Sequence, residues 1–140
     1  SSCFVPNTHE QKVVIPDHSL CSISFYDALE AHYVSACLNS SISRWIVKNY
    51  IAMHPSPNIM NYLPVAKYDQ ANPVHRLLAN LSENCHKEAL NGDSAKLSNF
   101  EGHIDEAVSR LWNITGKQLK RIQDDIIAPA SFRARNQIKY

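Results

Sequence analysis

The chain has 140 residues, enough for one domain of ordinary size with a short extension. Hydrophobic residues make up 44% and charged residues 19%, which is a globular composition and excludes an intrinsically disordered chain. The net charge of +1 excludes a strongly polybasic or acidic protein, and only three glycines argue against glycine-rich phosphate loops and tight all-β folds.

The start of the chain predicts a small β element. Residues 1–10 carry no hydrophobic periodicity and are expected to form a loose arm. Residues 11–15 are a β-prone run that Pro16 ends, and residues 20–25 alternate apolar with small polar side chains. Alternation with a period of two is typical of a half-buried strand.

From Asp27 onward the pattern predicts helices. Asp27 is suited to cap a first helix, which residues 39–41 separate from a second one, and Asn72-Pro73 is a favourable start for a long helix that Gly92 ends. Apolar residues of the long helix repeat at helical spacing and are expected in the core: Val74, Leu77, Leu78, Leu81, Cys85 and Ala89. Core positions are also expected for the aromatic residues Trp45, Tyr50, Tyr62 and Trp112.

Two capping boxes predict where the last helices begin. Ser98 and Glu101 have the spacing at which a hydroxyl and a carboxylate satisfy backbone donors reciprocally, and Thr115 and Gln118 repeat this spacing. The fold class predicted from the whole pattern is α+β, mostly helical: a small N-terminal β element followed by about five helices. Residues 11–127 are expected to form a single domain, and residues 128–140 a basic tail.

The ends of the chain and its cysteines indicate a cytoplasmic fragment. No apolar run is long enough to span a membrane, and no signal peptide is visible. The chain lacks an initiator Met, so we expect a piece of a longer protein. The four cysteines are widely spaced, which favours reduced thiols over a metal site or a disulfide.

The sequence contains no motif for independent catalysis. A nucleophile elbow, a phosphate loop and a His-Glu-x-x-His metal helix are all missing. Asp124 and Asp125 are adjacent, but neighbours on a helix point about 100° apart and do not share one site. We therefore expect no enzymatic activity from this chain alone.

The charges are distributed unevenly along the chain. Residues 81–106 contain six acidic and two basic side chains, whereas residues 117–140 contain six basic and two acidic ones. The basic residues of the 117–140 stretch have the composition of a phosphate-contacting surface, and equally that of a solvated helix followed by a tail. The polar, proline-braced residues 53–58 suit a loop that contacts base edges, although a plain connector has the same composition.

Three stretches, in order, resemble a known family. They are Glu-Ala-His-Tyr-Val-Ser-Ala-Cys-Leu-Asn-Ser at 30–40, Ile-Met-Asn-Tyr-Leu-Pro-Val at 59–65, and Ile-Asp-Glu-Ala-Val-Ser-Arg-Leu-Trp-Asn-Ile-Thr at 104–115. Together they resemble the C-terminal target-recognition region of bacterial adenine-specific N6 DNA methyltransferases, including the fused methylase–endonucleases of type II restriction–modification systems. The similarity covers about residues 13–126, with Trp112-Asn113 in place of the family's Tyr-Gly.

The resemblance implies a recognition fragment rather than a whole enzyme. The family's catalytic Asn-Pro-Pro-Tyr motif and its cofactor-binding glycine motif are absent, so this fragment would hold no cofactor. S-adenosylmethionine would bind elsewhere in the parent enzyme. The implied partners are double-stranded DNA and the catalytic methyltransferase domain of the same parent chain, with no membrane.

The residues expected to bind DNA fall into two groups. Base edges would be contacted by the loop residues His54, Ser56, Asn58 and Asn61. Phosphates would be contacted by Lys48, Lys67, Lys117, Lys120, Arg121, Arg133 and Arg135. The alternative is a helical interaction module that docks the catalytic domain or a partner subunit without touching DNA, its apolar stripes at Leu77/Leu81 and Ile104/Leu111 pairing as antiparallel helices.

Overall fold

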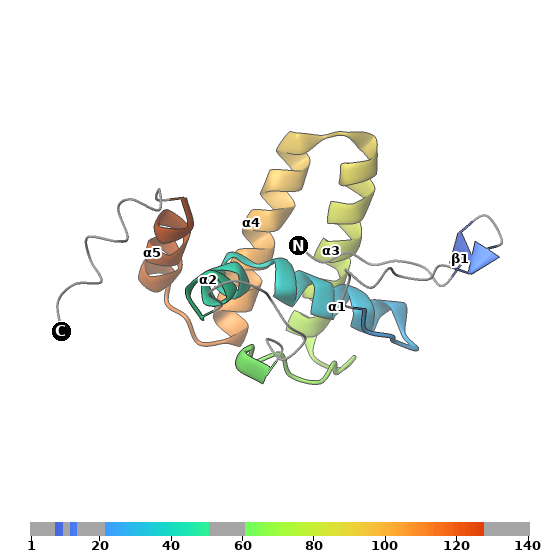
Figure 1. The fold of residues 1–140 in the computed structure, drawn as a ribbon, viewed down its shortest axis with the longest axis horizontal. Coiled ribbons are helices and arrows are strands. Elements are labelled where there is room, and N and C mark those ends of the chain that lie inside the picture. Colours follow the sequence, from blue (N-terminus) through green and yellow to red (C-terminus); the bar gives the residue numbers. More distant parts are fainter. Residues whose placement is uncertain (1–7, 10–11, 14–21, 51–60, 128–140) are drawn as a thin grey trace.

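The computed structural model describes residues 8–9, 12–13, 22–50 and 61–127, and this part of the chain contains five α-helices. They are α1 (Ala28–Asn39), α2 (Ser41–Tyr50), α3 (Pro73–Asn91), α4 (Ser94–Leu111) and α5 (Gly116–Ile127). Helices α3 and α4 form a long antiparallel hairpin, α1 packs across α3, and α2 and α5 pack together beside α4 (Figure 1).

The predicted α+β fold class is wrong, because the described fold is helical. Strands β1 (Thr8–His9) and β2 (Lys12–Val13) pair antiparallel, but each has only two residues, and Figure 1 draws β1 at one edge of the molecule, away from the helices. No strand occurs in residues 22–50 or 61–127, and residues 22–25 of the predicted second strand lack regular structure. An alternating run becomes a strand only beside a partner that takes up its backbone hydrogen bonds, and the buried residues of the described core cluster all lie on helices.

Three helix ends lie where the sequence predicts them. The Asp27 carboxylate accepts the Leu29 backbone N–H at 2.9 Å and caps α1. Asn72 caps α3 in the same way, with Pro73 as its first residue. Gly92 ends α3 with a φ of 75°, a left-handed conformation that glycine adopts without strain.

Helix α4 begins earlier than the predicted capping box. Its N-cap is Asp93, whose carboxylate accepts the Lys96 backbone N–H at 3.0 Å, and Ser98 and Glu101 lie inside the helix. Starting at Asp93 adds a helical turn with its backbone hydrogen bonds, so a good cap farther upstream prevails over the motif.

The second capping box is confirmed and sets the start of α5. The Gln118 side chain accepts the Thr115 backbone N–H at 2.8 Å, and the Thr115 hydroxyl accepts the Gln118 N–H at 3.4 Å. Just before it, Asn113 adopts a φ of 56°, which lets the chain turn sharply between α4 and α5.

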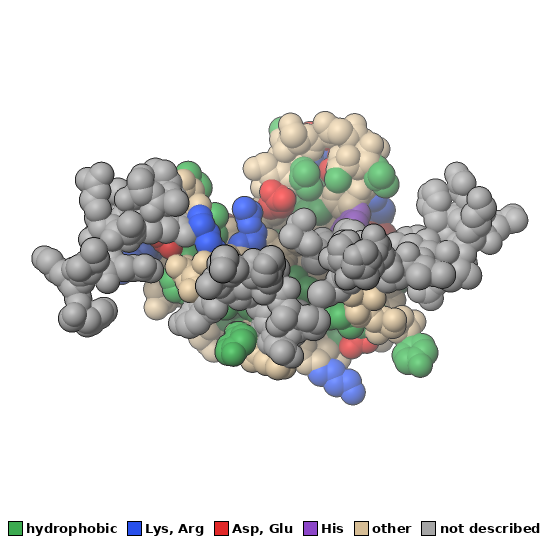
Figure 2. All heavy atoms as spheres, viewed as in Figure 1, with side chains coloured by type: hydrophobic (Ala, Val, Ile, Leu, Met, Phe, Trp, Pro, Cys, Tyr) green, Lys and Arg blue, Asp and Glu red, His purple; other side chains and the backbone are tan. Residues whose placement is uncertain are grey.

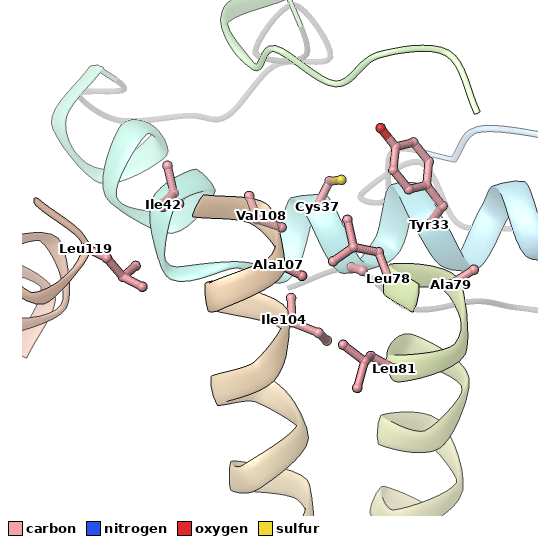
Figure 3. Close-up of a cluster of buried hydrophobic side chains, with 11 residues drawn as sticks. Tyr33, Cys37, Ile42, Leu78, Ala79, Leu81, Ile104, Ala107, Val108 and Leu119 are labelled. Atoms are coloured by element: carbon pink, nitrogen blue, oxygen red, sulfur yellow. The ribbon is translucent and has the colours of Figure 1, made fainter. Parts of the chain in front are cut away.

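The core lies where α1, α3 and α4 meet and continues toward α2 and α5. Tyr33, Leu78 and Val108 are fully buried at its centre (Figure 3). Ile42 of α2 and Leu119 of α5 extend the core toward these two helices. Three core predictions are wrong: Leu77 is 44% exposed, Tyr62 is 68% exposed, and Ala89 is also exposed. Trp45 and Trp112 are half-buried, and the Tyr50 side chain lies outside the described part.

Candidate nucleic-acid interface

Helix α5 has three different sides. Leu119 and Ile122 pack against the core. Lys120, Gln123, Asp124 and Ile127, at helical spacing, line a groove that faces the α3–α4 hairpin. The third side faces solvent and carries Lys117 and Arg121, one helical turn apart and both exposed.

The C-terminal turn of α5 is tied to α2 by two hydrogen bonds. The Trp45 indole N–H donates to the Asp125 carboxylate at 2.7 Å. The Lys48 ammonium donates to the Ile126 backbone carbonyl at 2.8 Å, where the negative end of the α5 dipole favours a cation. These bonds hold α5 in a fixed orientation on the rest of the molecule.

The buried residue Asp105 of α4 hydrogen-bonds both α2 and α5. Its side chain is buried, and its carboxylate accepts the Ser41 backbone N–H at 2.7 Å and the Gln123 side-chain amide at 2.9 Å. Ser41 is the first residue of α2, so the carboxylate also lies at the positive end of that helix dipole. One buried acid therefore joins α2, α4 and α5.

The predicted phosphate contacts on α2 and α5 differ in how far they are already engaged. Lys120 forms an ion pair with Asp124 at 3.0 Å, and Lys48 is bound to the end of α5. Lys117 and Arg121 make no hydrogen bond or ion pair with any residue of the described part through their side chains, so their charges are directed to solvent. The free cations on α5 are therefore Lys117 and Arg121.

Arg44 is a further cation that the sequence reasoning missed. It is exposed on the first turns of α2, lines the groove together with Lys120, and makes no ion pair within the described residues. Its position four residues before Lys48 places both on one helix face, and this spacing is the sequence signal that could have identified it. Figure 2 shows Lys and Arg side chains gathered where α2 and α5 adjoin the hairpin. We call Arg44, Lys48, Lys117, Lys120 and Arg121 the basic end.

The groove between the hairpin and the basic end has a volume of about 1010 Å³. Its apolar wall includes Cys85, Ala89 and Leu97, and its polar rim includes Arg44 and Glu101. The groove is open to solvent along the exposed side of α4 and suits an amphipathic segment better than a small, enclosed ligand.

None of the other residues predicted to contact DNA forms a contact with the basic end in the described part of the chain. Asn61, in a short 3₁₀ turn, and Lys67 are exposed on the segment before α3. Neither forms a hydrogen bond or ion pair with a residue of the basic end. His54, Ser56, Asn58, Arg133 and Arg135 lie outside the described residues.

Neither a metal-binding cluster nor a reactive thiol is found among the described residues. No group of three or more His, Cys, Asp or Glu in this part of the chain could hold a metal ion. Cys37 and Cys85 are free thiols, and burial raises their pKa to about 12 and about 11, so both are protonated at neutral pH and are poor nucleophiles.

Comparison of the chain with protein-family models, with curated proteins and with solved structures finds no match. Among the helices described, none has the length and apolar character needed to cross a bilayer.

Proposed function

We propose that the chain recognises DNA as the target-recognition region of a site-specific adenine-N6 DNA methyltransferase. The observation that carries this proposal is the basic end, where free cations lie on a helix that hydrogen bonds fix to α2 and α4. The three family-like stretches, in the order of the methyltransferase region, support the choice of enzyme class. Methyl transfer and S-adenosylmethionine binding would belong to another part of the parent chain.

A duplex would be held mainly through its phosphates. Each Lys or Arg that neutralises a phosphate releases condensed counterions, so binding weakens as salt rises. Lys117 and Arg121 are available at once, whereas Lys120 would first exchange Asp124 for a phosphate. The acidic α3–α4 hairpin would point away from the DNA, because like charges repel.

Salt-dependent duplex binding tests the proposal. With about four phosphates contacted, the logarithm of the affinity should fall with the logarithm of salt at a slope of roughly −3.6. Removing two phosphate contacts with Lys117→Ala and Lys120→Ala should make the slope shallower, at roughly −1.8 by the same relation. Fluorescence anisotropy with a labelled random duplex measures both slopes.

Lys87→Ala is the matched control, because Lys87 is an exposed lysine that pairs with Glu83 on the hairpin. It should leave the slope unchanged. Absence of duplex binding, or binding that salt does not weaken, would contradict the proposal.

The groove favours a second candidate, a module that docks the catalytic domain without touching DNA. Ala89 and Asn91 are both exposed at the end of α3, but Ala89 lines the groove and Asn91 does not. If docking is the function, Ala89→Glu in the parent enzyme should abolish methylation while Asn91→Glu retains it. The isolated chain should then show no affinity for duplex DNA.

A further inference from the structure

The position of Arg121 on α5 points to a more specific role than phosphate contact. Arg121 and Lys117 occupy the side of α5 opposite Leu119, so they project farthest from the core. The hydrogen bonds that fix α5 come from residues 123–126, in its C-terminal half. The N-terminal half of α5 carries the free cations, and no described residue covers its outer side.

The dimensions of α5 suit the major groove of a duplex. Its 12 residues span about 18 Å, and the major groove, about 12 Å wide, admits an α-helix. Gly116 and Lys117 lie in the first turn, and the Thr115–Gln118 capping box keeps that turn helical. A helix held in this way can present a side chain to base edges with little loss of conformational entropy.

Lys120 and Arg121 of α5 suit different DNA contacts, one with a phosphate and the other with a base. Lys120 is paired with Asp124 and lies at the groove rim, which suits a flanking phosphate. Arg121 has no carboxylate partner among the described residues, so its planar guanidinium keeps its donors available. Arginine donates two parallel hydrogen bonds to the O6 and N7 atoms of guanine, the commonest specific contact in the major groove.

We infer that α5 lies in the major groove of the target duplex and that Arg121 contacts a guanine there, so Arg121 determines part of the sequence specificity. The inference rests on the proposed function, since it requires duplex binding. It places at least one base contact on α5, in addition to the loop residues that the sequence predicts.

Guanine N7 provides a sharp test. The preferred duplex is first selected from a random library with the 140-residue chain, and each guanine of that duplex is then replaced by 7-deazaguanine. Replacement at one position should weaken binding by about tenfold or more, because one of the two hydrogen bonds is lost. With Arg121→Ala the same replacement should have no further effect.

Arg121→Lys separates base contact from phosphate contact. A lysine satisfies a phosphate but lacks the bidentate geometry, so this variant should keep its salt dependence and lose the preference for that guanine. Arg110→Lys is the matched control, because Arg110 is an exposed arginine on α4 that pairs with Glu106. It should keep both the salt dependence and the preference.

The two proposals fail in different ways. Salt-dependent binding with no selected sequence, or with no effect of 7-deazaguanine, overturns the major-groove role of Arg121 and leaves the proposed function standing. Complete absence of duplex binding overturns both. A guanine preference that survives Arg121→Ala assigns the base contact to another residue and overturns the inference.

Discussion

At the scale of single residues, Asp105 shows how a buried acid can organise a helical fold. Its carboxylate is buried, yet both of its oxygens accept hydrogen bonds, one from the start of α2 and one from α5. A buried carboxylate is tolerable when donors satisfy it in this way. The same pair of bonds fixes the helix that carries Arg121.

Replacing Asp105 should therefore reduce stability more than replacing an exposed acid. In Asp105→Ala the half-buried Ser41 N–H and Gln123 amide lose their acceptor, which should lower the free energy of unfolding by up to about 1–3 kcal/mol for each donor that no water satisfies. Asp124→Ala, which removes only an exposed ion pair, should cost about 0–1 kcal/mol. Urea unfolding followed by circular dichroism measures both, and equal losses would contradict the assigned role of Asp105.

The His32–His86 pair introduces a dependence on pH. The two rings meet edge to face with centroids 5.2 Å apart, and His32 is buried with Nδ1 3.3 Å from the Ser82 hydroxyl. Burial lowers the pKa of His32 below its ordinary value of 6.5, and the charge of His86 lowers it further, while nearby Glu83 raises it. The folded state thus resists protonation of His32.

The sign of the pH effect follows from that lowered pKa. Between the folded and unfolded pKa values the unfolded chain binds more protons, so stability is full above about pH 6.5, declines as the pH falls from there toward the lowered pKa, and levels off below it. His32→Gln, which keeps a hydrogen-bonding side chain, should flatten this decline. Thermal unfolding between pH 7.5 and 5 measures the pH dependence of stability. His103→Gln is the control, because His103 is exposed. Identical pH profiles for His32→Gln and the unsubstituted chain would refute the role of His32.

At the scale of elements, periodicity predicts that α3 exists but does not resolve which of two neighbouring leucines is buried. Leu77 and Leu78 are 100° apart on the helix and both fit the apolar stripe. The structure buries Leu78 completely and leaves Leu77 44% exposed, because α1 and α4 both pack on the side of α3 that carries Leu78 and Leu81. Only the positions of the neighbouring helices decide this.

Truncating the two leucines should accordingly have unequal effects. Leu78→Ala leaves a cavity in the centre of the core and should lower the free energy of unfolding by about 2–5 kcal/mol. Leu77→Ala removes a side chain that is partly in water and should cost less than about half as much, in proportion to the apolar area it buries. Chemical denaturation of both variants compares them directly, and a larger loss for Leu77→Ala would contradict the described packing.

Four helix-end signals were predictable from sequence, whereas the cap of α4 and the engagement of the basic residues were not. Asp27, Asn72, Gly92 and the Thr115–Gln118 box act over two to four residues, so the local sequence contains the whole interaction. Lys48 instead binds a carbonyl 78 residues away. Charge patterns therefore find the basic end but do not distinguish its free cations from its occupied ones.

At the scale of the whole molecule, a nearly neutral chain distributes its charges unevenly, with an excess of acids on the α3–α4 hairpin and an excess of bases on α2 and α5. The α3–α4 hairpin holds most of the acids of residues 81–106, and its two lysines are neutralised locally, Lys87 by Glu83 at 2.9 Å and Lys96 by Asp93 at 3.1 Å. The free cations of the basic end lie on α2 and α5. Such an arrangement orients the molecule as it approaches a polyanion.

This polarity predicts which lysines a bound duplex protects. Lys117 and Lys120 should be acetylated several-fold more slowly in the complex, because phosphates cover their ammonium groups and exclude the reagent. Lys87 and Lys96, exposed on the hairpin, should react at the same rate with and without DNA and serve as controls within one molecule. Peptide mass spectrometry after brief acetylation measures all four rates. Protection of Lys87 and Lys96 instead would mean that the hairpin, and not the basic end, faces the duplex.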